Sequence, residues 1–191
     1  MRPFYFLILS FSLFATADKW PEPLLSSTVS EDSSIIVRVT PGNGFFKLES
    51  EIKNAVADVY IWNGSNGYDY SRSVILLNPA APLDIFVDDD GYIITLDNWY
   101  ETGYGKAVVI YDQSGDIVKS YELTELFPDS VEFNKLSRSV SSLHWRCREL
   151  DAEFNYGYFY VPHMLGGSFR FDYKKGKYDR IMPNERCKNG S

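Results

Sequence analysis

Two stretches of the chain follow one hairpin pattern, and this repetition limits the fold more than any other feature. In each, an apolar strand ends in an aromatic residue and Asp, a turn ends in Gly, and a polar strand returns. The stretches are 111–115 and 171–176, about 60 residues apart. A repeat of this length indicates supersecondary units that stack on one another. With 57–77 as a more divergent copy, the sequence predicts an all-β fold of about three antiparallel four-stranded meanders.

The clearest of these units lies between residues 82 and 123. Short apolar stretches alternate there with turns rich in Asp and Gly, which suit hairpin loops. The run 107–111 is apolar throughout, which predicts a strand buried on both faces. Consecutive strands joined by hairpins form an antiparallel meander. The expected strands are Leu83–Val87, Tyr92–Asp97, Ala107–Tyr111 and Asp116–Leu123, with a loop at Asn98–Gly105.

Weaker patterns extend the prediction to the rest of the chain. On the N-terminal side we expect two hairpins, the second with a long loop that carries Tyr68 and Tyr70. Two short helices are expected before the third unit, because Pro128 ends the first and Ser130 suits the N-cap of the second. The expected strands are Ile35–Thr40, Phe45–Leu48, Ala57–Trp62, Ser73–Leu77, Ser141–Arg146, Tyr156–Val161, Gly167–Phe171 and Lys177–Met182, and the expected helices are Leu123–Phe127 and Ser130–Leu136.

The N-terminus has the features of a cleavable export signal. One positive charge at Arg2 precedes an apolar run from Phe4 to Phe14, which leads into a small-x-small site. The run is shorter than the roughly 20 apolar residues that a membrane-spanning helix needs. A core strand or a membrane anchor is the alternative, and no later segment is apolar enough to span a membrane. The expected segments are a signal peptide at 1–17, an irregular lead-in at 18–34 and one β-rich domain at 35–191 of a secreted or periplasmic protein.

Two cysteines, Cys147 and Cys187, agree with this location. In an oxidising compartment they predict one disulfide, which would stabilise the fold by roughly 4 kcal/mol in the chain-entropy model. Two free thiols or a metal site are the alternatives, and the lack of histidine at a ligand spacing disfavours the metal. Asn63 and Asn189 each begin an N-glycosylation sequon, although 63–67 also has the composition of a tight turn.

The charge and the missing motifs exclude several classes of function. The formal net charge is −7, which repels phosphate backbones and anionic lipids, so nucleic acid is not an expected partner. No phosphate-binding glycine loop, CxxC pair, HExxH helix or basic stripe is present. Aligning Gly91 with the glycine of an EF-hand places Phe86 where the first carboxylate belongs, so 88–91 is interpreted as a turn. We expect neither a metal nor a cofactor.

The central unit resembles one blade of a β-propeller. The resemblance lies in two hairpins, 87–92 and 109–118, together with Leu96–Trp99. These patterns are similar to those of uncharacterised secreted bacterial proteins with propeller-like repeats. Known propellers have at least about four blades, and this chain offers about three. The resemblance therefore implies an open fragment or a ring that a dimer completes; a β-sandwich with similar hairpins is the alternative fold.

The loop that follows the second strand of this unit holds residues suited to bind a ligand. Trp99 and Tyr104 offer flat rings, while Asp97, Asn98 and Glu101 offer hydrogen-bonding groups, a combination typical of sugar-binding sites. Packing in a β-rich core is the competing role for the two aromatic residues.

Two histidines are the remaining candidates for a site. His144 lies in an expected strand, and His163 lies near a loop, where it is a candidate ligand contact. A Ser-His-Asp set would need a serine such as Ser168 within reach of the imidazole. The stretch 166–170 lacks the last glycine of a nucleophile elbow, which disfavours this arrangement.

The sequence favours a non-catalytic domain, secreted or periplasmic, that binds a protein or a glycan through its edge loops. A small extracytoplasmic hydrolase is one alternative, either glycosidase-like with Asp97 and Glu101 as its paired carboxylates or dependent on His163. A structural component whose strand edges pair with another copy or a partner is the other.

Overall fold

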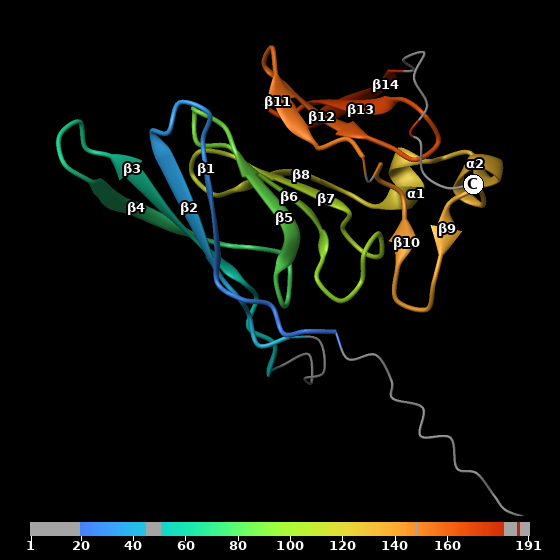
Figure 1. The fold of residues 1–191 in the computed structure, drawn as a ribbon, viewed down its shortest axis with the longest axis horizontal. Helices are drawn as coiled ribbons and strands as arrows, with labels where there is room; N and C mark the ends of the chain where they lie inside the picture. Colours follow the sequence, from blue (N-terminus) through green and yellow to red (C-terminus); the bar gives the residue numbers. More distant parts are fainter. Residues whose placement is uncertain (1–19, 45–50, 148, 182–186, 188–191) are drawn as a thin grey trace, which may run out of the picture.

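The computed structural model describes residues 20–44, 51–147, 149–181 and 187. Within these residues the chain forms three four-stranded antiparallel sheets and one two-stranded sheet (Figure 1). In each four-stranded sheet the spatial order of the strands follows their order along the chain. Each sheet is therefore a meander, and the prediction of an all-β fold with about three blade-like units is confirmed.

Each sheet takes its strands from one continuous part of the chain. The first contains β1 (Ser26–Val29), β2 (Ile35–Thr40), β3 (Val56–Trp62) and β4 (Tyr68–Ile75). The second contains β5 (Pro82–Val87), β6 (Ile93–Asn98), β7 (Val108–Tyr111) and β8 (Ile117–Tyr121). The third contains β11 (Glu153–Asn155), β12 (Tyr158–Pro162), β13 (Ser168–Asp172) and β14 (Lys177–Ile181). Four short elements separate the second sheet from the third along the chain, namely α1 (Leu123–Leu126), α2 (Ser130–Phe133), β9 (Ser137–Arg138) and β10 (Leu143–His144).

The second sheet lies between the other two and is buried on both faces. Alternate residues of a strand point to opposite faces, and β7 shows the consequence. Val109 and Tyr111 belong to the core shared with the first sheet, whereas Val108 and Ile110 belong to the core shared with the third. All four side chains are fully buried. This explains why 107–111 is continuously apolar, and it makes the fold a stack of three sheets instead of a two-layer sandwich.

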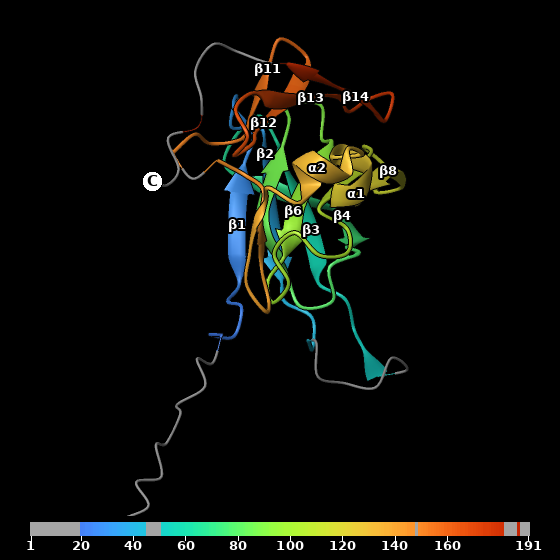
Figure 2. The ribbon, with the colours of Figure 1, turned by 90° about the vertical axis from the view of Figure 1, so that its right-hand side faces the viewer.

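The third sheet is turned relative to the first. In Figures 1 and 2 the strands β12 to β14 run at a steep angle to β1 and β2. The two short helices precede this sheet, and Leu126 and Phe127 at the end of α1 contribute to its core. Asp129, not Ser130, is the N-cap of α2, because its carboxylate accepts a hydrogen bond from the Val131 N–H at 2.7 Å.

Three expectations for the first sheet need correction. Residues 18–34 are not irregular throughout, because Ser26–Val29 forms β1 and pairs with β2. The strand β2 pairs on its other side with β3, and 45–48, its expected partner, lies outside the described residues. Tyr68 and Tyr70 lie on β4 and not in a loop, because they pair with Trp62 and Tyr60 across the hairpin, and aromatic residues favour strands.

The inner edge of the third sheet is interrupted where a continuous strand was expected at 141–146. The strand β10 covers only part of that stretch and pairs with β9. Arg146 then forms one antiparallel bridge with His163, just beyond β12, and β11 occupies the same edge further along. The predicted disulfide between Cys147 and Cys187 is confirmed, with a Cα–Cα distance of 5.6 Å, and it ties this edge to the tail of the chain.

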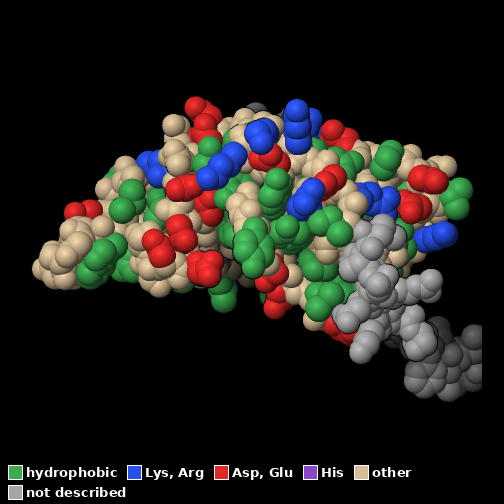
Figure 3. All heavy atoms as spheres, turned by 90° about the horizontal axis from the view of Figure 1, so that it is seen from above, with side chains coloured by type: hydrophobic (Ala, Val, Ile, Leu, Met, Phe, Trp, Pro, Cys, Tyr) green, Lys and Arg blue, Asp and Glu red, His purple; other side chains and the backbone are tan. Residues whose placement is uncertain are grey.

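The first and third sheets each have one outward face. That of the third sheet is charged, with ion pairs from Arg170 to Asp179 and from Lys175 to Asp172. Figure 3 looks down on this side and shows basic and acidic side chains interspersed. A polar outer face is how stacked-repeat proteins end their stack. Among the described residues, no helix is long and apolar enough to cross a membrane.

Candidate functional site

Asp97, the first residue of the expected site, is fully buried at the end of β6. Its backbone adopts a left-handed conformation with φ of 57°, which turns the chain into the following loop. One carboxylate oxygen accepts hydrogen bonds from the Gly103 N–H and the Trp145 indole N–H, both at 2.8 Å. The side chain therefore fastens its own loop and reaches across to the residues that lead into the third sheet.

Arg146 provides the counter-charge for this buried carboxylate. Its Nε lies 2.9 Å from Asp97 Oδ2, in an ionic contact without an aligned hydrogen bond, and its Nη1 lies 2.6 Å from Asp84 Oδ2. Burial raises the pKa of Asp97, while Arg146 and the hydrogen bonds from Trp145 and Gly103 act in the opposite direction. The guanidinium is thus held between two carboxylates of the second sheet.

The other residues of the expected loop site also make contacts within the protein. Asn98 accepts a hydrogen bond from the Asn78 side chain at 2.7 Å, and the Trp99 indole N–H donates to the Pro21 carbonyl at 2.7 Å. The Tyr104 hydroxyl lies 3.4 Å from the Ser139 carbonyl. Partial burial raises the pKa of Glu101. The structure brings these residues together in one loop. The hydrogen bonds of Asn98, Trp99 and Tyr104 connect that loop to other parts of the chain.

His163, the sixth expected site residue, does not face solvent. It is fully buried, and its ring packs against Phe127 and Phe169 at centroid distances of 5.5 and 4.9 Å. Neither ring nitrogen has a hydrogen-bond partner among the described residues. Burial lowers the pKa of His163 to about 4, with a smaller contribution from Arg180. A ligand contact through this ring, as the sequence predicts, would require the core to open.

The burial of Asp97 also bears on the hydrolase alternative. A glycosidase needs two carboxyl groups that both reach the substrate. Asp97 is fully buried and engaged by Gly103, Trp145 and Arg146. The pair of Asp97 and Glu101 is therefore not arranged for this chemistry.

The Asp-rich turn between β5 and β6 is a hairpin turn, as its composition predicts. Asp88 Oδ1 accepts hydrogen bonds from the backbone N–H groups of Asp90 and Tyr92 at 3.0 and 2.7 Å, and Asp88 Oδ2 accepts one from the Tyr173 hydroxyl at 2.7 Å. Burial raises the pKa of Asp88. In the described part of the chain no group of three or more His, Cys, Asp or Glu residues is placed to hold a metal ion.

The outward face of the first sheet carries an aromatic cluster that the sequence interpretation missed. We call the four rings of Tyr60, Trp62, Tyr68 and Tyr70 the aromatic face. Tyr60 packs edge-on against Tyr70, and Trp62 against Tyr68, with centroid distances of 5.9 and 5.3 Å. Trp62 is 43% exposed and Tyr70 59% exposed. The signal was available in the sequence, because the residues alternate on two paired strands.

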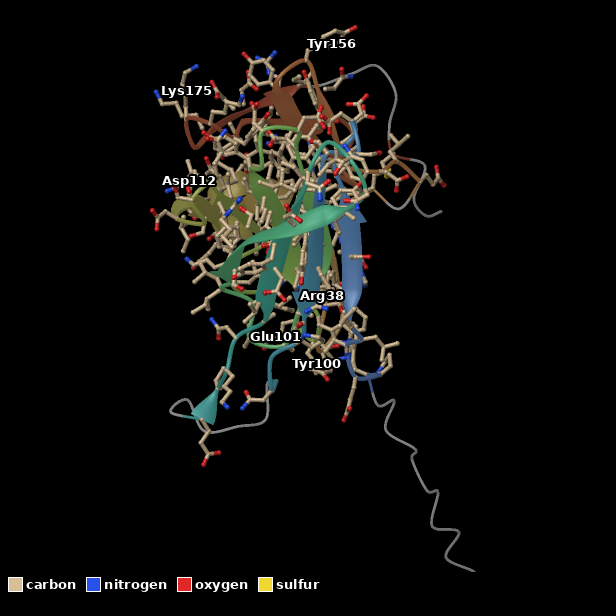
Figure 4. All side chains as sticks on the ribbon, turned by 90° about the vertical axis from the view of Figure 1, so that its left-hand side faces the viewer. Arg38, Tyr100, Glu101, Asp112, Tyr156 and Lys175 are labelled. Atoms are coloured by element: carbon tan, nitrogen blue, oxygen red, sulfur yellow. A yellow bond between two sulfur atoms is a disulfide. The ribbon has the colours of Figure 1, made fainter. Side chains whose placement is uncertain are left out.

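Polar side chains lie beside these rings on the same face. Arg38 pairs with Asp58 at 3.0 Å, and the Ser73 hydroxyl donates to the other Asp58 oxygen at 2.6 Å. The Tyr70 hydroxyl lies 3.0 Å from the Ser73 hydroxyl, which extends the network to the aromatic face. Figure 4 looks onto this side of the molecule, with Arg38 between the end that carries Tyr156 and the end that carries Tyr100 and Glu101.

A separate cavity of about 450 Å³ lies between the second and third sheets. Arg146 and Asp84 form part of its wall, and the interrupted inner edge of the third sheet forms another part. The lining residues are Asp84, Phe86, Thr102, His144, Trp145, Arg146, Cys147, Leu150, Asp151, Ala152, Val161 and Pro162. The mixture of apolar walls and a few polar groups is typical of ligand pockets.

Comparison with known proteins assigns no family to this chain. No family model matches it, and no curated protein matches it. Among solved structures, it is similar to the crystal structure of HIRA(644-1017), with a TM-score of 0.39 and 13% identity over 87% of this chain. The chain spans 56% of that structure. A similarity this weak carries no argument, so the description of the fold as blade-like depends on the strand order of its own sheets.

Proposed function

We propose that this chain is an exported, non-catalytic domain that binds a neutral glycan on the aromatic face. The observation that carries the proposal is the partial exposure of Trp62 and Tyr70 on an open sheet. Exposed aromatic residues that contact one another on a sheet are suited to bind a ligand. Sugar rings present C–H faces that stack on aromatic rings, and their hydroxyl groups need hydrogen-bond partners.

The polar groups of this face favour a neutral ligand. On strands β2 to β4 the outward face carries one cation and one anion, Arg38 and Asp58, and these pair with each other. Asp58 and Ser73 provide oxygens that accept hydrogen bonds from sugar hydroxyls, and Arg38 provides N–H donors. Because this face has no net charge, a charged polymer bound to it would lack ionic partners. A neutral glycan would leave no charge unpaired, either on the ligand or on the protein.

Export is supported by the disulfide. Bonds of this kind persist in oxidising compartments, and Cys147 is joined to Cys187. The N-terminal sequence 1–17, which has the pattern of a signal peptide, lies outside the described residues.

Binding to neutral polysaccharides by affinity gel electrophoresis, together with a glycan array, tests the proposal. We expect retardation by at least one neutral glycan, and a loss of affinity of about tenfold or more in the variant Trp62→Ala/Tyr70→Ala, since tenfold corresponds to about 1.4 kcal/mol. The matched control is Tyr156→Ala, which removes a tyrosine that is 92% exposed on the hairpin between β11 and β12. Blank arrays and unretarded gels, or equal binding by the double variant, would overturn the proposal.

A further inference from the structure

The cavity beside Arg146 is a candidate site independent of the aromatic face. It lies between β5 and β12, in the space left where the inner edge of the third sheet is interrupted. Its volume of about 450 Å³ falls within the roughly 300–1,000 Å³ that small-molecule pockets occupy. The disulfide at Cys147 fixes one of its walls to the tail of the chain.

The charges around this cavity are unbalanced. Among the described residues that line it, Arg146 is the single Lys or Arg, and its charge is matched by the fully buried Asp97 behind it. Asp84 and Asp151 also line the cavity, and 45% of the Asp84 side chain is exposed. In the described part of the chain, the cavity wall and the ion pair behind it therefore hold one guanidinium and three carboxylates. The excess negative charge at the wall attracts a cation and repels an anion.

The rest of the wall suits an apolar stem attached to that cation. Phe86, Val161 and Pro162 come from the strands on the two sides, and Leu150 and Ala152 come from the loop before β11. An aliphatic or aromatic body gains free energy by leaving water for such a surface. The Phe86 ring also offers a face that attracts a positive charge.

We propose that this cavity binds an organic cation, namely an ammonium or guanidinium group carried on an apolar stem. The cationic head lies against Asp84 and Asp151, and the stem lies along Phe86 and Pro162, which are partly exposed. Two sources share this chemistry: a free amine and the side chain of a Lys or Arg in a partner protein. The acidic chain, with a formal net charge of −7, attracts either one over a longer range.

Titration of the isotope-labelled protein with matched probes tests the proposal, with the Trp145 indole N–H signal as the reporter. The probes are phenethylammonium, the neutral phenethyl alcohol and the anionic phenylpropionate. We expect saturable binding of the cation, at least fivefold weaker binding of the alcohol and none of the anion. The variant Asp84→Asn should bind the cation at least fivefold more weakly. The variant Asp116→Asn removes one charge from the exposed turn between β7 and β8, and it should bind the cation with unchanged affinity.

Two further arms complete the experiment. A capped Ala-Lys-Ala peptide that binds at least as tightly as phenethylammonium identifies a partner's side chain as the source, whereas binding of the amine alone identifies a free amine. Tyr70→Ala should leave cation binding unchanged, so failure here is distinguishable from failure of glycan binding. Equal binding of the alcohol or the anion, or an unchanged affinity in Asp84→Asn with a native melting temperature, would overturn the proposal.

Discussion

The Nε of Arg146 lies 2.9 Å from the Oδ2 of Asp97, and this contact joins the second sheet to the inner edge of the third. Asp97 is fully buried, so removing its counter-charge leaves a carboxylate in the core without an ionic partner. Breaking a buried pair in this way costs about 3–5 kcal/mol. We expect Arg146→Met to lower the free energy of unfolding by about that amount, as measured by urea denaturation.

An exposed arginine–aspartate pair provides the control for this measurement. Arg38 and Asp58 are 3.0 Å apart, with 44% and 17% of their side chains exposed. Pairs of this kind contribute about 1 kcal/mol or less, so Arg38→Met should have a small effect. Equal losses in the two variants would show that burial of Asp97 does not decide the cost.

Gly103 lies where a side chain cannot fit. Its φ is +74°, and a Cβ atom there would lie 2.3 Å from the Leu143 carbonyl oxygen. Gly103→Ala should therefore displace the loop from β10 and weaken the hydrogen bond from Gly103 to Asp97. We expect a loss of unfolding free energy well above the roughly 1–2 kcal/mol that a left-handed conformation costs a residue with a side chain.

Gly64 separates the steric contribution from the backbone contribution. Its φ is +80°, and a Cβ atom there would have no neighbour within 4 Å. Gly64→Ala should therefore cost only the backbone amount, about 1–2 kcal/mol, in the same chemical denaturation assay. A loss for Gly103→Ala no larger than this would contradict the steric explanation.

The disulfide closes a loop across the whole third sheet. Cys147 and Cys187 are separated by 40 residues, and a loop of this length corresponds to about 4 kcal/mol in the chain-entropy model. The double variant Cys147→Ser/Cys187→Ser should lose about that much unfolding free energy. Reduction of the native protein should reproduce the loss, and an unchanged denaturation midpoint after reduction would refute it.

Local patterns were sufficient to predict the second sheet and the last hairpin of the third. The apolar run 107–111 indicated a strand buried on both faces, and β7 has this position. The shared hairpin pattern at 111–115 and 171–176 marks the turns between β7 and β8 and between β13 and β14. Period and turn composition are local properties, so one sequence was sufficient to identify them.

The candidate site was harder to predict because it depends on contacts between distant residues. Asp97 is polar and stands next to Asn98 and Trp99, which suggests a ligand site, but its counter-charge comes from the distant Arg146. His163 lies near a loop in the sequence and in the core in the structure. The aromatic face depends on Tyr68 and Tyr70 being part of β4, whereas the sequence pattern predicts a long loop that carries both residues.

His163 makes the stability of the fold depend on pH in the acidic range. Its imidazole is fully buried, and burial lowers its pKa from 6.5 to about 4. The charged groups that act on it are Arg180, which lowers the pKa, and Glu132, which raises it. Between these two pKa values the unfolded chain binds a proton that the folded chain does not. The stability of the fold therefore falls as the pH drops from about 6.5 to about 4.

The variant His163→Leu should remove this part of the acid dependence. The difference of about 2.5 pKa units corresponds to about 3 kcal/mol. We expect the unfolding free energy of His163→Leu, relative to the native protein, to rise by about that amount between pH 7.5 and pH 4. The variant Leu136→Ala is the control and should keep the native slope, because it alters a buried position that carries no titratable group. Parallel pH profiles for His163→Leu and the native protein would show that this imidazole does not limit stability in acid.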